Sequence, residues 1–225
     1  MPGAALDSAE ARLLQTLRAL GDPERAAQEK RYQKSRWQHW GVALPKMDAA
    51  IKKTLGDLSQ DDALELCRRL WSAPVWDLKI VAGRVLARKS TAPDAKVWGF
   101  VTERLADLDG WAVADNLAPA ASRCLLADPS RLDRVATWID RPHLWTRRAA
   151  LVFTLPWAKE KRDPEWMLGW AARLADDPEW FIQKAVGWWL RELSKRDPER
   201  VRRFLAENGG ALRAVGRREA GKYLA

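Results

Sequence analysis

The fold is decided by a tryptophan-led window that recurs along the chain. Its copies read Trp76–Ile80 (WDLKI), Trp111–Asp115 (WAVAD), Trp145–Ala149 (WTRRA) and Trp180–Lys184 (WFIQK). Successive copies lie 35, 34 and 35 residues apart. A repeat of about 35 residues is typical of solenoids that stack pairs of helices, because each helical hairpin buries its apolar face against the next. The spacing therefore predicts an all-α fold, an α-solenoid of helical-hairpin repeats.

A second recurring pattern, an Asp-Pro pair, predicts where helices begin. It occurs at Asp22-Pro23, Asp128-Pro129, Asp163-Pro164, Asp177-Pro178 and Asp197-Pro198. In each pair the Asp side chain can cap the first free amides, while Pro occupies the first helical position, where no donor is needed. We expect Pro129–Ile139 and Pro164–Leu174 to supply partner helices, and Gly209-Gly210 to precede a short C-terminal helix. No low-complexity linker interrupts the series, so we expect one domain over residues 1–225.

The composition restricts the function classes. Of the 225 residues 47% are hydrophobic, which is enough for a core, and the formal net charge of +9 points to a polyanionic partner. Apolar runs such as Ala185–Leu190 are far too short to span a membrane. Residues 1–14 lack the basic and apolar regions of a secretory signal. With two Cys and two His in the chain, neither a disulfide framework nor a zinc site is expected, and we predict no metal and no cofactor.

Asp115 distinguishes its window from the other copies. The equivalent position carries Ile80, Ala149 or Lys184. Because Asp115 lies four residues after Trp111, the two side chains should project from the same face of one helix. Asp115 has two interpretations at this point: a functional carboxylate, or a structural acid that pairs with Arg148 or Arg123. The other window tryptophans (Trp76, Trp145 and Trp180) are interpreted as packing between repeats.

Several functional side chains are expected on the same helical arc as Asp115. At about 100° per residue from each repeat's Trp, the arc includes Arg148 and Trp188. The same arithmetic adds the cations Lys79, Arg84 and Lys184. Equivalent helices of a solenoid lie side by side, so the arc predicts a concave basic groove. In such a groove, cations can bind the phosphate backbone and indoles can stack on bases. A single carboxylate among them would repel DNA, so it is expected to have a specific role, such as stabilising positive charge on a substrate.

The sequence also resembles the AlkD branch of the HEAT-repeat DNA alkylation repair glycosylases, from about Arg12 to Tyr223. The resemblance is carried, in order, by Arg31–Lys34 (RYQK), Gly41-Val42, Gly110–Pro119 (GWAVADNLAP), Leu144–Ala150 (LWTRRAA), Phe181–Trp188 (FIQKAVGW) and Arg217–Ala220 (RREA). The chain departs from the family pattern at Gly110–Ala112, where that pattern often reads Trp-Trp-Asp; this departure bears on lesion preference and rate.

The resemblance implies a HEAT-like repeat fold and an alkylpurine DNA glycosylase, a hydrolase that excises N3- and N7-alkylated purines from duplex DNA in base excision repair. Residue by residue, it implies that Asp115, Trp111 and Trp188 are catalytic. It implies further that Arg148 contacts DNA and that Tyr32 borders the lesion. We accordingly expect a monomer that binds duplex DNA and does not bind membranes. We expect it in the cytoplasm, associated with the nucleoid when it is bound to DNA.

A function of a different class fits the same fold. A solenoid can also act as a non-catalytic module that binds branched DNA or a protein partner. The joint presence of Trp111, Asp115, Arg148 and Trp188 favours the enzyme, because a purely DNA-binding protein gains nothing from an acid in its basic groove.

Overall fold

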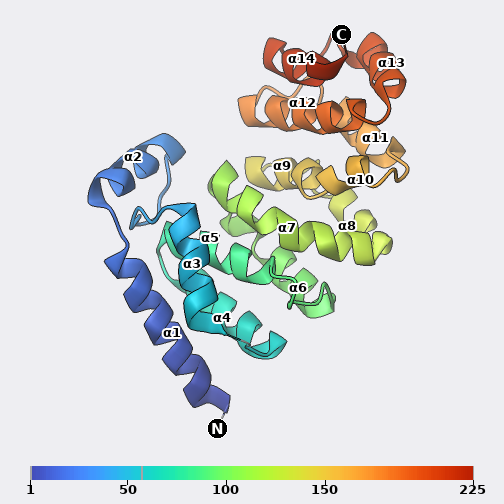
Figure 1. Ribbon diagram of the computed structural model, residues 1–225. Helices are drawn as coiled ribbons and strands as arrows, with labels where there is room; N and C mark the ends of the chain where they lie inside the picture. The colour runs from blue at the N-terminus through green and yellow to red at the C-terminus, as the bar shows by residue number, and fades with distance from the viewer. Residues whose placement is uncertain (1, 57, 225) are drawn as a thin grey trace. The chain divides into compact units, whose positions relative to one another are not determined.

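A computed structural model describes residues 2–56 and 58–224 of the chain (Figure 1). Within these ranges the regular elements are all helical, and the single β-type contact is an isolated parallel bridge between Gln38 and Val75. The all-α prediction is confirmed. Among the described helices, none combines the length and apolar character that a membrane span needs.

The chain divides into two compact units, Met1–Cys124 and Leu125–Ala225. In the first unit α1 packs against α3, α3 against α5, and α4 against both α5 and α6. Its elements are α1 (Pro2–Ala19), α2 (Pro23–Gln33), α3 (Leu44–Leu55), α4 (Gln60–Ser72), α5 (Trp76–Leu86), α6 (Ala95–Glu103), the 3-10 turn η1 (Leu105–Asp107) and most of α7 (Trp111–Ala127).

The second unit is organised around α12, which packs against α9, α10, α13 and α14 (Figure 1). Its elements are the end of α7, η2 (Pro129–Arg131), α8 (Leu132–Ala136), α9 (Leu144–Val152), α10 (Leu155–Lys159), α11 (Glu165–Arg173), α12 (Trp180–Ser194), α13 (Pro198–Asn208), α14 (Ala214–Ala220) and η3 (Gly221–Tyr223). The short C-terminal helix expected after Gly209-Gly210 is α14.

The repeated tryptophans mark helix starts, as the spacing predicts. Trp76, Trp111 and Trp180 are the first residues of α5, α7 and α12, and Trp145 is the second residue of α9. These helices then carry the core, because their following apolar residues are buried, as in Ile80 and its neighbours. The predicted partner segments contain η2 with α8, and α11.

The Asp-Pro pairs initiate helices in two different ways. Asp22 and Asp197 are N-caps, and each accepts a hydrogen bond from the amide three residues later. Asp128 caps the 3-10 turn η2 instead. Asp163 and Asp177 each accept the amide two residues later, at 3.0 and 2.9 Å, so α11 and α12 begin slightly after the Pro. A short turn that bonds the i+2 amide delays the helix, by one residue after Pro164 and by two after Pro178.

Two glycines allow helices to approach closely beside predicted site residues. A Cβ on Gly83 of α5 would lie 2.7 Å from the carbonyl oxygen of Asn116 on α7. A Cβ on Gly187 of α12 would lie 2.7 Å from the carbonyl oxygen of Gly216 on α14. Because no larger side chain fits these contacts, Gly83 sets the spacing of α5 and α7 next to Asp115, and Gly187 does so for α12 and α14 next to Trp188.

Candidate functional site

Tyr32 and Trp111 meet at the start of α7. Tyr32, at the end of α2, is 73% exposed, and its ring lies edge-on to the half-buried indole of Trp111, with centroids 6.4 Å apart and planes at 84°. This is a favourable geometry for an aromatic pair. The structure therefore brings together two of the predicted site residues, from segments almost 80 residues apart in the sequence.

Hydrogen bonds to two carboxylates hold the segment after α2 near Trp111. The carboxylate of Asp109, two residues before Trp111, accepts hydrogen bonds from the Ser35 hydroxyl at 3.1 Å and from the Arg36 amide at 3.2 Å. The buried carboxylate of Asp77 on α5 accepts the amides of Trp40 and Val42, each at 2.8 Å. The segment after α2 is thus fixed to both α5 and the start of α7.

The side chains beneath α2 also include a buried histidine. His39 stacks on Trp76 with ring centroids 4.7 Å apart, and its Nδ1 lies 4.0 Å from a carboxylate oxygen of Glu29. Burial lowers the pKa of His39 and raises the pKa of Glu29, so both groups are driven toward their neutral forms. Trp76 is 5% exposed, and its interpretation as a packing residue is confirmed.

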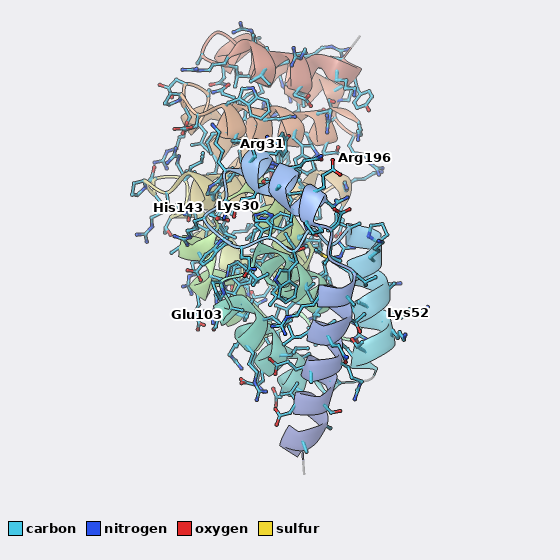
Figure 2. The ribbon with its side chains drawn as sticks, turned by 90° about the vertical axis from the view of Figure 1, so that its left-hand side faces the viewer. Lys30, Arg31, Lys52, Glu103, His143 and Arg196 are labelled. Carbon is cyan, nitrogen blue, oxygen red and sulfur yellow. The ribbon has the colours of Figure 1, made fainter. Side chains whose placement is uncertain are left out.

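None of the residues of α2 is buried, and its last turn carries two cations. Lys30 and Arg31 are exposed and immediately precede Tyr32. Figure 2 shows both on α2, in the foreground of that view. The helix thus presents two cations next to the Tyr32–Trp111 pair.

Asp115 lines a surface pocket one helical turn after Trp111. The pocket encloses about 300 Å³, and its other lining residues are Asp48, Arg84, Ala87, Arg88, Asn116 and Pro119. Asp115 is half-buried, and two arginines share the pocket with it. A carboxylate at a partly enclosed surface can interact with positive charge on a bound molecule.

The arrangement of this pocket depends on Arg84. Its guanidinium forms an ion pair with Asp48 on α3 and donates to the Asn116 side-chain oxygen at 2.9 Å. The Asn116 amide group in turn donates to the carbonyl of Ala112 at 2.9 Å. Arg84 thus lines the same pocket as Asp115, but its charge is shared with Asp48. Arg123, considered above as a partner of Asp115, donates to the carbonyls of Arg88 and Thr91, both at 2.7 Å.

The prediction that Lys79 lies on the exposed arc is wrong. Lys79 is 2% exposed, and its ammonium group donates to the carbonyl oxygens of Trp71 at 2.6 Å and Ala73 at 3.2 Å. It also lies 4.0 Å from the ring centroid of Trp37. Burial lowers the pKa of Lys79 to about 8. The lysine therefore caps the C-terminal end of α4, where helix carbonyls lack amide partners.

The second unit carries the other predicted residues. Lys184 and Trp188 lie one turn apart on α12; Lys184 is exposed and Trp188 is half-buried. Arg148 on α9 is 4% exposed and donates to the carbonyl oxygen of Phe181 on α12 at 3.1 Å. The expectation of an exposed Arg148 is therefore wrong, because this guanidinium joins two helices. The combination of these residues with Asp115 in one site stays a prediction.

The remaining window tryptophans differ from each other. Trp145 is half-buried and packs against Phe181, with ring centroids 5.0 Å apart, in agreement with a packing role. Trp180 is 50% exposed, with the ammonium group of Lys184 5.0 Å from its ring centroid. The interpretation of Trp180 as a packing residue accounts for only half of its surface.

Sequence reasoning missed five residues of the Asp115 pocket: Asp48, Ala87, Arg88, Asn116 and Pro119. Pro119 lies inside α7, four residues after Asp115, and lacks the N–H that would bond the Asp115 carbonyl in a regular helix. A proline within a helical pattern is the signal that could have identified this position. Asp48 gives no such signal, since its role depends on contact with α5. Among the described residues, no group of three or more His, Cys, Asp or Glu side chains is suited to hold a metal.

Comparisons with known proteins agree with this architecture. The family model described as "DNA alkylation repair enzyme" matches residues 13–224. A solved structure described as a predicted DNA alkylation repair enzyme from Enterococcus faecalis is 23% identical, covers 91% of this chain and 97% of its own, and has a TM-score of 0.77. AlkD2 from Streptococcus mutans is 20% identical, with 89% and 95% covered and a TM-score of 0.59. The smu.31 protein of S. mutans UA159 is 18% identical, with 90% and 98% covered and a TM-score of 0.62.

No curated protein matches the chain. The similar structures show the same helical-repeat fold, which confirms the predicted all-α repeat architecture. The concave basic groove stays a prediction.

Proposed function

This chain belongs to the DNA alkylation repair enzyme family, and we propose that it acts as a DNA glycosylase that excises N3- and N7-alkylated purines from duplex DNA. The observation that carries the proposal is Asp115, a half-buried carboxylate one turn after Trp111 in a pocket that also holds Arg84 and Arg88. Phosphate binding alone would be weakened by that carboxylate, whereas a reaction that generates a cation would be accelerated by it.

The chemistry requires little more than charge stabilisation. Alkylation at N3 or N7 makes the purine a cationic leaving group, so the base departs as a neutral molecule when the C1′–N bond breaks. Positive charge then develops on the deoxyribose, and water adds to C1′ with loss of a proton. In the proposal Asp115 stabilises the sugar cation electrostatically and orients the attacking water. No general-acid histidine is needed to protonate the base.

The aromatic pair suits the nucleotide next to Asp115. Trp111 and the exposed Tyr32 present ring faces and edges that can contact a cationic base, an interaction of about 0.5 to 2 kcal/mol for each ring. The corresponding roles of Trp188 and Lys184, together with a monomeric state, stay predictions. Lys79 is not proposed to bind DNA, since its ammonium group is buried.

The direct test is a base-release assay. Incubation with a duplex that contains a single N7-methylguanine is expected to liberate the methylated base and leave an abasic site, detected by chromatography and by alkaline cleavage of the strand. An unmodified duplex serves as the control. If the protein released no base from any alkylated duplex yet bound branched DNA tightly, a non-catalytic binding module would replace the enzyme.

A second prediction concerns the cations of α2. Replacing Lys30 and Arg31 with Gln is expected to weaken duplex binding and to lower the slope of log K against log salt by up to about 0.9 for each lost phosphate contact. The matched control is the same charge change at Lys52 and Lys53, exposed on α3, where Figure 2 shows Lys52 projecting from the surface. Equal slopes for the two double variants would show that α2 makes no specific phosphate contacts.

A further inference from the structure

A five-residue motif occurs twice in the second unit. Lys161–Glu165 and Lys195–Glu199 both read KRDPE, 34 residues apart. The first copy forms the turn between α10 and α11, and the second forms the turn between α12 and α13. Capping explains the Asp-Pro-Glu part of the motif, as at the other helix starts, but it does not explain the two cations that precede it.

Both copies of the motif line one pocket. It encloses about 410 Å³. The first copy contributes Lys161, Arg162, Asp163 and Pro164, the second contributes Arg196 and Asp197, and the apolar residues Ala158 and Leu193 complete the lining. The equivalent arginines of the two copies, Arg162 and Arg196, are thus on the same pocket. Lys161 adds a third cation.

Two of the three cations of this pocket are available to a ligand. Lys161 and Arg196 are exposed, and neither side chain has a hydrogen bond or ion pair with any residue in the described ranges. Figure 2 shows Arg196 at the margin of the second unit. Arg162 is anchored, because it donates to the Leu126 carbonyl at 3.3 Å and lies 4.8 Å from the ring centroid of Trp157. It also forms an ion pair with Glu160 at 3.7 Å, which leaves part of its charge for a ligand.

The two carboxylates of the pocket are engaged by their own helices. Asp163 accepts the amide of Glu165 at 3.0 Å, and Asp197 accepts the amide of Arg200 at 2.9 Å. Each negative charge therefore lies against the positive end of a helix, which offsets its repulsion of an anion. Lys161 has a left-handed backbone conformation, with φ of 54°, which is unfavourable for a residue with a Cβ and is found in tight turns and at ligand sites.

From the duplicated motif and the shared pocket we propose that this site binds a phosphate group. Two guanidinium groups and one ammonium group supply more donors than a single carboxylate can use, and a phosphate has the acceptor oxygens to match them. The site is separate from the Asp115 pocket and does not depend on the proposed glycosylase activity. A DNA backbone and a free phosphate ion both present this group, and the experiment separates these two sources.

The first arm of the test uses inorganic phosphate and the full chain. In NMR titrations, the amide signals of the non-proline residues in 161–165 and 195–199 are expected to shift with phosphate and not with chloride at the same ionic strength. The double variant K161Q/R196Q should lose at least nine-tenths of the affinity. The control K159Q/R203Q removes the same charge from exposed residues that do not line the pocket and should retain it. Absence of shifts in the wild type, or equal loss in both double variants, would overturn the proposal.

The second arm identifies the source of the phosphate. If it belongs to DNA, the salt slope of duplex binding falls in K161Q/R196Q by up to about 0.9 per lost contact and stays near the wild-type value in K159Q/R203Q. If it is a free phosphate, the slopes of the two variants coincide while the NMR difference remains. Circular dichroism verifies that both variants keep the helical fold.

Discussion

Asp115→Asn is expected to reduce the excision of alkylated purine by about 2 to 4 kcal/mol of transition-state stabilisation, as for loss of a preorganised electrostatic group. The substitution keeps the size of the side chain and removes its charge. DNA affinity should hold or improve, because the carboxylate repels neighbouring phosphates in the ground state and becomes favourable only when the sugar is cationic. Single-turnover base release and equilibrium DNA binding measure the two effects separately.

The control for this prediction is Asp133→Asn, which removes one negative charge from an exposed position on α8. Excision by this variant should match the wild type. Thermal unfolding should show that Asp115→Asn remains folded. If the Asp115 variant excised at the normal rate, or if it unfolded, the residue would have a structural role and the catalytic assignment would be wrong.

The buried Lys79 is expected to make the stability of the protein increase with pH in the alkaline range. Its pKa is about 8 in the folded state against an ordinary value of 10.5, with burial as the main cause. Between these values the unfolded chain binds a proton that the folded chain does not, so the free energy of unfolding rises with pH. Below pH 8 both states are protonated and the folded state bears the full cost of burying the charge. The contribution amounts to at most about 3 kcal/mol.

Comparison with Lys79→Met isolates this contribution. The difference in the free energy of unfolding between wild type and variant should shift in favour of the wild type from about pH 8 upward, and level off above the ordinary lysine pKa of about 10.4. Lys52→Met, at an exposed position, should show no such change. Urea denaturation at a series of pH values provides the measurement, and a constant difference would contradict a neutral, buried amine.

The helix starts were predictable because local chemistry determines them. Trp111 and Trp180 begin helices where the repeat spacing places them, and Asp22 and Asp197 cap helices through bonds within three residues. The placement of Asp115 on the same helical face as Trp111 was also predictable, since residues four apart share a face of a helix whatever surrounds them.

The burial of Lys79 and Arg148 could not be predicted in the same way. A helical arc gives the direction of a side chain but not the neighbours that cover it. For Lys79 these neighbours are Trp37, which comes from the segment after α2, and the carbonyl groups at the C-terminal end of α4. For Arg148 the carbonyl of Phe181 is 33 residues distant. Long cationic side chains reach such carbonyls readily, so the charge of a residue alone does not assign it to the surface.

The course of α7 has a consequence for protein engineering. The division between the two compact units falls after Cys124, inside a helix that continues to Ala127. Separate expression of the two halves would therefore cut a helix rather than a loop, leave the amides of residues 125–127 without their helical acceptors and expose Leu125, which is 0% exposed in the intact chain. Insertions and split-protein designs are therefore better placed in an exposed turn than at the boundary that compactness alone suggests.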